Sequence, residues 1–127
     1  MTRARTVLTP TPPEAVLEHI EAGADLIVPL ANGAPVAILD ALEEHAAELT
    51  GVRIHQMHPL RTRRYMQGAF GDHLRHVSYF LSPVTRPHFA RGTIELVPAN
   101  FSEVPSLLRR LPNPWLAVPG AARSEPG

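Results

Sequence analysis

Seven histidines are the side chains that most readily indicate catalysis or metal binding. His55 and His58 are separated by two residues at the end of an apolar run, and His73 and His76 have the same spacing. In an extended strand this spacing points two side chains to opposite faces, and no third ligand follows either pair. We therefore expect no metal site, and we interpret these histidines as polar or half-buried residues.

A second group with possible chemistry is a basic cluster ahead of the third apolar run. Its members are Arg61, Arg63, Arg64, His73 and Arg75, with Tyr65 and Phe70 between them. Single-stranded nucleic acid binds mixtures of basic and aromatic residues, and arginine makes bidentate contacts to small anions. No nucleic-acid motif accompanies the cluster, so we expect no nucleic-acid partner. A solvated charged face and a site for a small anionic ligand both stay open.

Two predicted strand-to-helix turns hold the best candidates for a ligand site. They contain Asn32, Gly33, Ala34 and Pro35 in the first turn, and Asn100, Ser102 and Glu103 in the second. Helix N-termini favour anions, and ligands bind at the carboxyl edge of open parallel sheets. The same residues also suit turn geometry alone, with Pro35 at the first helical position and Ser102 as an N-cap. Both interpretations remain open, because Gly33 alone makes neither a dinucleotide fingerprint nor a phosphate loop.

The elements that must position these residues alternate along the chain. Apolar runs predict strands at 26–30, 52–57, 77–81, 94–97 and 115–118. Helical patterns cover 11–23, 35–51, 82–92 and 102–110, and residues 59–72 are predicted as a long loop with room for a short helix. The alternation predicts an α/β fold with a mostly parallel sheet of about five strands, helices on both faces and right-handed crossovers.

Local signals refine two of the helices. Thr11 and Glu14 have the spacing of a capping box, which predicts that the Thr11 side chain caps the first helix. Pro87 falls at the fifth position of the helix that Ser82 opens, so we expect that helix to be short or bent.

Composition limits the class of protein. The 127 residues fit one domain, which we place at 12–118 between a flexible N-terminus, 1–11, and a disordered tail, 119–127. Twelve arginines balance twelve acidic residues, and this zero net charge argues against duplex DNA or an anionic membrane as a partner. The absence of cysteine excludes disulfides, a thiolate zinc site and a cysteine nucleophile. With neither a membrane-length apolar run nor a secretory signal, the expected location is the cytoplasm.

Several segments taken together resemble the acetyl-CoA hydrolase/transferase family, which includes acetate, succinate, butyrate and 4-hydroxybutyrate CoA-transferases. The most specific segments are Gly71–Pro83 (GDHLRHVSYFLSP) and Leu96–Leu108 (LVPANFSEVPSLL). Arg86 and Gly92 fit the spacing of the family's intervening helix, and Leu26–Leu42 is similar to its first strand, loop and helix.

The resemblance extends over residues 12–118 and implies a function. Members of this family transfer coenzyme A between an acyl-CoA and a free carboxylate, or hydrolyse the thioester, so that the CoA thioester is a substrate and no cofactor is held covalently. They use a glutamate nucleophile, which forms a mixed anhydride and then a glutamyl-CoA thioester. That glutamate and a glycine-rich CoA motif belong to a second α/β half, whereas the resemblance here covers the first.

We therefore expect no catalytic residue in this chain and no CoA-transferase activity from it alone. The resemblance implies that the two turns described above shape an acyl or carboxylate pocket, with Arg86 as an anion contact. Two alternatives stay open. The chain is a non-catalytic module that forms a homodimer or pairs with a separately encoded C-terminal half, or it is a truncated gene remnant.

Overall fold

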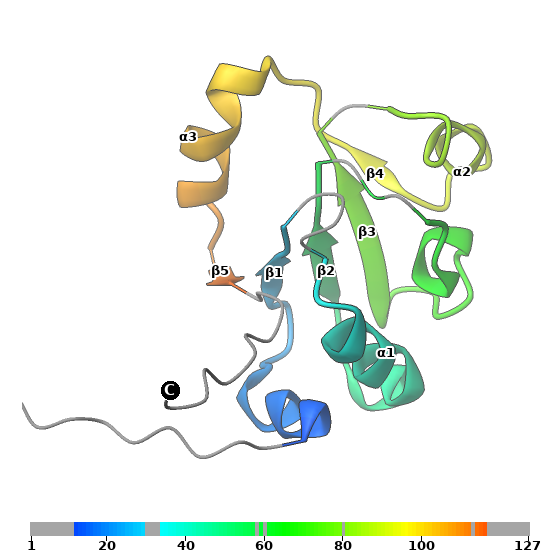
Figure 1. The fold of residues 1–127 in the computed structure, drawn as a ribbon, viewed down its shortest axis with the longest axis vertical. Coiled ribbons are helices and arrows are strands. Elements are labelled where there is room, and N and C mark those ends of the chain that lie inside the picture. The colour runs from blue at the N-terminus through cyan, green and yellow to red at the C-terminus, as the bar shows by residue number, and fades with distance from the viewer. Residues whose placement is uncertain are drawn as a thin grey trace, which may run out of the picture.

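The computed structural model describes residues 12–29, 34–57, 59, 61–79, 81–112 and 114–116, and its central feature is a parallel sheet (Figure 1). The described strands are β1 (Asp25–Ile27), β2 (Val52–His55), β3 (Leu74–Ser78), β4 (Glu95–Leu96) and β5 (Pro114–Leu116). They lie in the order β4-β3-β2-β1-β5, and every neighbouring pair is parallel. The predicted α/β fold with a parallel sheet of about five strands is confirmed.

The direction of the chain across the sheet reverses once. Strands β1 to β4 follow one another toward one edge, and the chain then returns to place β5 beside β1. Such a reversal forms a crevice at the carboxyl ends of the strands, where open α/β folds bind their ligands. The described helices are η1 (Pro13–His19), α1 (Val36–Glu44), η3 (Ala46–Glu48), η4 (Arg64–Gln67), α2 (Arg86–Ala90), η5 (Phe101–Glu103) and α3 (Val104–Arg109), where η marks 3-10 helices.

Side chains of alternating strand residues enter two separate cores. Leu26, Ile54 and Leu74 pack with residues of α1 and η4 on one face of the sheet. Val77 and Tyr79 pack with residues of α3 on the other face. Because successive strand residues point to opposite faces, β2 places Ile54 in the first core and His55 on the α3 face. Helices on both faces are therefore confirmed, as Figure 1 shows with α1 and α3 on opposite sides of the strands.

The predicted capping box is wrong. The N-cap of η1 is Pro12, which makes no side-chain cap hydrogen bond, and Thr11 lies outside the described residues. The Ala15 N–H bonds the Pro12 carbonyl at 3.0 Å. This contact closes a 3-10 turn. Because Pro12 and Pro13 have no N–H, the start of η1 has fewer donors for a side chain to cap.

The N-cap predicted at Ser102 is also wrong. Ser102 lies inside η5, and the N-cap of α3 is Glu103, which makes no side-chain cap hydrogen bond. The Glu103 N–H bonds the Asn100 carbonyl at 2.9 Å, so the backbone turn begins before Ser102. Pro105, in the first turn of α3, needs no cap because it has no N–H.

The third strand begins earlier than its apolar residues predict. It spans Leu74–Ser78 rather than 77–81, because Arg75 and His76 extend the ladder with β2 in the register Arg53↔Arg75 and Ile54↔His76. The short helix foreseen within the loop 59–72 is η4.

Other predictions concern helix length and the chain ends. Helix α2 begins at Arg86, so Pro87 occupies its first turn, and the prediction of a short helix is confirmed. The expected tails, 1–11 and 119–127, lie outside the described residues. Within the described part of the chain, every helix is too short or too polar to cross a membrane.

Candidate functional site

Three buried polar side chains form a hydrogen-bonded triad on the α3 face of the sheet. Asp25 belongs to β1, His55 ends β2, and Tyr79 directly follows β3. His55 Nε2 lies 2.8 Å from Asp25 Oδ1, and His55 Nδ1 lies 2.8 Å from the Tyr79 hydroxyl oxygen. Each residue of the Asp25–His55–Tyr79 triad is at most 6% exposed, so water cannot replace these hydrogen bonds easily.

One arrangement of protons, an ionised Asp25 beside a neutral His55, satisfies all three groups. An ionised carboxylate only accepts, so His55 Nε2–H donates to Asp25. In a neutral imidazole the other nitrogen then accepts, so the Tyr79 hydroxyl donates to His55 Nδ1. Burial and the neighbouring Asp25 charge raise the pKa of the Tyr79 phenol, which keeps this proton in place.

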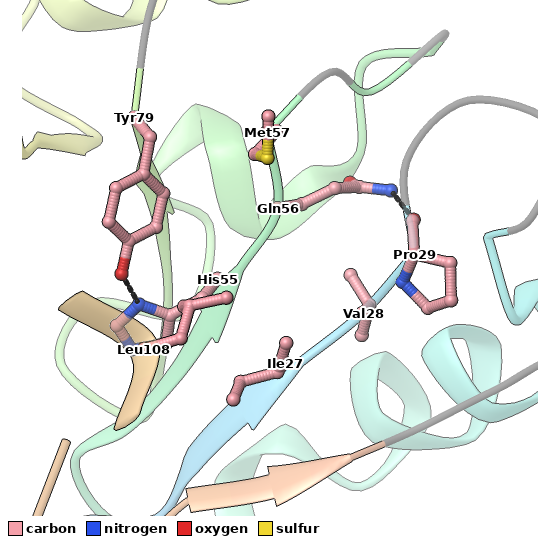
Figure 2. A pocket seen from close by; sticks show the side chains of 8 residues that line it. All are labelled: Ile27, Val28, Pro29, His55, Gln56, Met57, Tyr79 and Leu108. Carbon is pink, nitrogen blue, oxygen red and sulfur yellow. Dashed lines mark hydrogen bonds between the residues drawn. The ribbon is translucent and has the colours of Figure 1, made fainter. Parts of the chain in front are cut away.

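The triad borders a small hollow at the carboxyl ends of β1, β2 and β3, which we call the carboxyl-edge hollow. Its volume is about 90 Å³, and it is lined by Ile27, Val28, Pro29, His55, Gln56, Met57, Tyr79 and Leu108. Figure 2 shows the Tyr79 hydroxyl directed at the His55 ring, with Leu108 of α3 beside them. The Gln56 amide donates to the Pro29 carbonyl at 2.8 Å, which holds the ends of β1 and β2 together.

The shape and lining of the hollow limit what it can hold. The space is small, and it suits a short acyl chain rather than a whole coenzyme A molecule. Most of the lining is apolar, and the polar groups are the side chains of His55, Gln56 and Tyr79. A few polar groups in an apolar hollow are typical of a site that orients a small ligand.

None of the predicted site residues that the structure describes lines this hollow. Asn32 and Gly33 lie outside the described residues. Ala34 is half-buried, and Pro35 is the N-cap of α1 rather than its first helical residue. The described residues of this turn therefore precede α1 directly, and their ligand role stays a prediction.

The second predicted turn is brought together as expected, but at the surface. The Asn100 amide donates to Glu103 Oε1 at 3.1 Å, and Ser102 lies between them in η5. All three residues are exposed, as is Arg86 at the start of α2. Arg86 does not line the carboxyl-edge hollow with the triad, so its role as an anion contact also stays a prediction.

Sequence reasoning missed the triad. His55 drew notice only through its spacing to His58, which lies outside the described residues. Asp25 and Tyr79 stand within or next to apolar runs, where an isolated polar residue in a predicted strand is the one available signal. In the described part of the chain, no three His, Asp or Glu residues gather as ligands for a metal ion.

The basic cluster is an ion-paired surface rather than an open anion site. Arg63 bonds Asp40, and its Nη2 lies 2.7 Å from Glu43 Oε1 on α1. Arg64 stacks over the Phe70 ring at 5.2 Å. Arg64 also lies 4.0 Å from Glu43, His73 bonds the Leu49 carbonyl, and Arg75 contacts Asp72 and Glu95. The structure thus favours the interpretation of the cluster as a solvated, charge-paired face.

A second buried histidine lies on the α1 face of β3. His76 Nε2 lies 2.7 Å from the Ser78 hydroxyl, while His76 Nδ1 has no hydrogen-bond partner within the described structure. Burial, with repulsion from His55 and His88, lowers the pKa of His76 to about 3. Tyr65 packs beside it, and the Tyr65 hydroxyl is likewise unpaired among the described groups. This pair belongs to the core and does not line the hollow.

A parallel sheet with one reversal defines an open α/β domain, a class of fold that binds ligands at the carboxyl edge, where the apolar hollow of this chain lies. No family model matches the sequence. The chain is 33% identical over 90 residues to the succinyl-CoA:cyclohexane-1-carboxylate CoA transferase of Geobacter metallireducens, covering 71% of this chain and 20% of that protein. It is 30% identical over 101 residues to the 4-hydroxybutyrate coenzyme A transferase of Clostridium kluyveri, covering 78% of this chain and 24% of that protein.

A solved structure has a similar fold. RipA from Yersinia pestis superimposes with a TM-score of 0.68 at 24% identity, over 79% of this chain and 26% of that one, which shows the fold. The chain is thus a distant homologue of the CoA-transferases, and it spans about a quarter or less of the length of the curated relatives it matches.

Proposed function

We propose that this chain contributes the acyl or carboxylate pocket of an acyl-CoA:carboxylate CoA-transferase or acetyl-CoA hydrolase. The observation that supports the proposal is the carboxyl-edge hollow, which lies where open α/β folds bind ligands, in a domain homologous to CoA-transferases. Its volume of about 90 Å³ suits a short acyl group or a small acid. The nucleotide part of coenzyme A would have to lie outside it.

The names of the two curated relatives support this class of substrate. One exchanges coenzyme A between succinyl-CoA and cyclohexane-1-carboxylate, and the other acts on 4-hydroxybutyrate. Both activities require a pocket for a carboxylic acid or its acyl form. A larger depression of about 400 Å³ is a poorer candidate, because Glu14, Glu18 and Glu48 line it and would repel an anionic acid.

The hollow supplies binding groups rather than a nucleophile. No glutamate lines it among the described residues, and the Asp25 carboxylate is engaged by His55. Glu103 is exposed and bonded to Asn100. We therefore assign the nucleophilic glutamate to a second α/β half, which is supplied by further residues of a longer protein or by a separate polypeptide. On its own the 127-residue chain is inactive.

Binding and activity can be tested separately. Nuclear magnetic resonance titration of the isotope-labelled chain with butyrate should shift the amide signals of Gln56, Met57 and Tyr79. The amides of Gly68 and Gly92 line a depression near the start of β3 and serve as internal controls. Shifts confined to that depression, or none at saturating butyrate, would refute the pocket.

An exchange assay tests the assignment of the nucleophile. The purified chain should not transfer coenzyme A from acetyl-CoA to succinate, and addition of a CoA-transferase second half should produce transfer. Exchange at enzymatic rates by the chain alone would contradict the assignment of the nucleophile to another half.

A further inference from the structure

One helical residue closes the carboxyl-edge hollow. Leu108 lies in the last turn of α3, whereas the other lining residues belong to β1 and β2 or directly follow β1, β2 and β3. Figure 2 shows Leu108 beside the hydrogen bond between His55 and Tyr79. Leu108 therefore forms a wall of the hollow that the sheet itself does not supply.

Helix α3 holds this wall in place one turn earlier. Val104 is 3% exposed and packs with Val77 and Tyr79 in the core of this face. Residues four apart share one face of a helix, so Leu108 projects from α3 on the same side as Val104. Leu108 is half-buried and packs against the same core. A packed side chain thus limits the width of the hollow on the side of α3.

The volume of the hollow limits which acyl chains it can hold. At about 90 Å³ the hollow is smaller than an apolar cavity of about 150 Å³ that accommodates one benzene molecule. A six-membered ring would have to displace the wall, and forcing extra carbon atoms into a packed apolar site is unfavourable. An unbranched chain is narrower and fits without that displacement.

We propose that Leu108 is a specificity-determining residue, which admits an unbranched acyl chain to the hollow and excludes one as wide as a six-membered ring. This inference rests on the proposed function, because it assumes that the hollow holds the acyl chain. The tail of the chain then lies inside against Leu108, and its carboxylate or thioester lies at the mouth. This orientation follows because neither arginine nor lysine lines the hollow among the described residues, so that water at the mouth solvates an anion better.

Butyrate and benzoate are matched probes, because each carries one carboxylate and they differ in the width of the apolar part. Both are titrated into the isotope-labelled chain and monitored at the Gln56 and Met57 amides. We expect benzoate to bind about tenfold more weakly than butyrate, the effect of a moderate over-packing penalty. Equal affinities for the two acids, or tighter binding of benzoate, would overturn the size selection.

The orientation of the chain has its own measurement. In a nuclear Overhauser spectrum of the butyrate complex, the butyrate methyl group should contact the Leu108 methyl groups. The methylene next to the carboxylate should not. Contacts from that methylene alone would place the carboxylate inside the hollow and overturn the proposed orientation.

Variants of two neighbouring leucines isolate the wall. Leu108→Ala shortens the wall and should tighten benzoate binding about tenfold. Leu107→Ala removes the same atoms from another half-buried leucine of α3, which packs against the same core but does not line the hollow. It should leave the benzoate affinity unchanged. Equal gains in both variants, or no gain in Leu108→Ala, would overturn the assignment to Leu108.

A change in the opposite direction is an independent test, which also applies if Leu108→Ala does not fold. Leu108→Phe adds carbon atoms to the wall and should weaken butyrate binding about tenfold, whereas Leu107→Phe should not change it. Unchanged butyrate binding in a folded Leu108→Phe variant would contradict the role of Leu108.

The outcomes separate this inference from the proposed function. If butyrate shifts the hollow amides but benzoate binds as tightly, the size selection is overturned while the pocket stands. If neither acid shifts the hollow amides, the proposed pocket fails, and the role of Leu108 fails with it.

Discussion

Two tyrosine–histidine pairs lie on opposite faces of the sheet with almost the same ring geometry. The rings of His55 and Tyr79 have centroids 6.0 Å apart at 36°, and those of Tyr65 and His76 are 6.0 Å apart at 32°. The first pair shares a hydrogen bond, whereas the Tyr65 hydroxyl and His76 Nδ1 have no partner in the described structure.

The two pairs differ in the group that is hydrogen-bonded to Nε2 of each histidine. Asp25 fixes one nitrogen of His55 as a donor, so the other must accept, and Tyr79 meets it. Among the described residues the His76 ring bonds the Ser78 hydroxyl, which can donate or accept and therefore does not set which ring nitrogen carries the proton. The Asp25 carboxylate therefore orients the His55 ring toward Tyr79 through a hydrogen bond. His76 has no such partner among the described residues, and its burial lowers its pKa.

The largest effect expected of a substitution at neutral pH comes from removing the centre of the triad. His55→Phe leaves the Asp25 carboxylate and the Tyr79 hydroxyl buried without partners, so the free energy of unfolding should fall by about 3 kcal/mol. Urea denaturation measures this change. His73→Phe, at an exposed histidine, is the control and should lose less. If His55→Phe lost no more stability than His73→Phe, the claim that the hydrogen bonds of the triad stabilise the fold would be wrong.

Acid should destabilise the chain through the other histidine. The pKa of His76 is lowered from 6.5 to about 3 in the folded state, so between these values the unfolded chain binds more protons. Stability is thus fully present above pH 6.5 and falls as the pH drops toward 3, by up to about 1.4 kcal/mol per pH unit. Urea unfolding at several pH values should show a shallower loss for His76→Gln. An identical pH slope in the variant would contradict the burial argument.

Removing the hydroxyl of Tyr79 should have an intermediate effect. Tyr79→Phe breaks its bond to His55 and leaves the buried Nδ1 unpaired, which should cost about 2 kcal/mol. Thermal and urea unfolding of the variant test this value. A change of less than about 0.5 kcal/mol would mean that the bond adds nothing beyond ring packing.

The same substitution on the other face should have the smallest effect. Tyr65→Phe removes a buried hydroxyl that has no partner among the described residues, so the free energy of unfolding should stay the same or rise by up to about 1 kcal/mol. The difference between the two Tyr→Phe variants in the free energy of unfolding measures how much the Tyr79–His55 hydrogen bond stabilises the fold. Equal losses in the two variants would contradict it.

The fold was accessible from the sequence to a large extent, because it follows from local patterns. Branched apolar runs located the strands, and their alternation with helical segments predicted a parallel sheet. The start of β3 was missed because Arg75 and His76 interrupt the apolar pattern, although pairing with β2 holds them in the strand. The cap at Ser102 was misassigned because the Asn100 carbonyl accepts the Glu103 N–H, so the backbone turn begins before Ser102.

The triad could not be predicted, because its contacts depend on strand register. Asp25 and His55 are 30 residues apart, and Tyr79 is 24 residues beyond His55. They meet because Asp25 pairs with Arg53 in the parallel ladder, which places His55 two residues further along the same face. The order of the strands sets this register, and no local spacing in the sequence reveals it.

The protonation of His55 tests the central claim most directly, since the proton on the ring decides which partner of the triad donates to it. A long-range proton–nitrogen correlation spectrum of the isotope-labelled chain at neutral pH identifies which ring nitrogen carries the proton. We predict a neutral ring with its proton on Nε2, facing Asp25, and an unprotonated Nδ1 that accepts from Tyr79. A proton on Nδ1, alone or together with one on Nε2, would contradict the account.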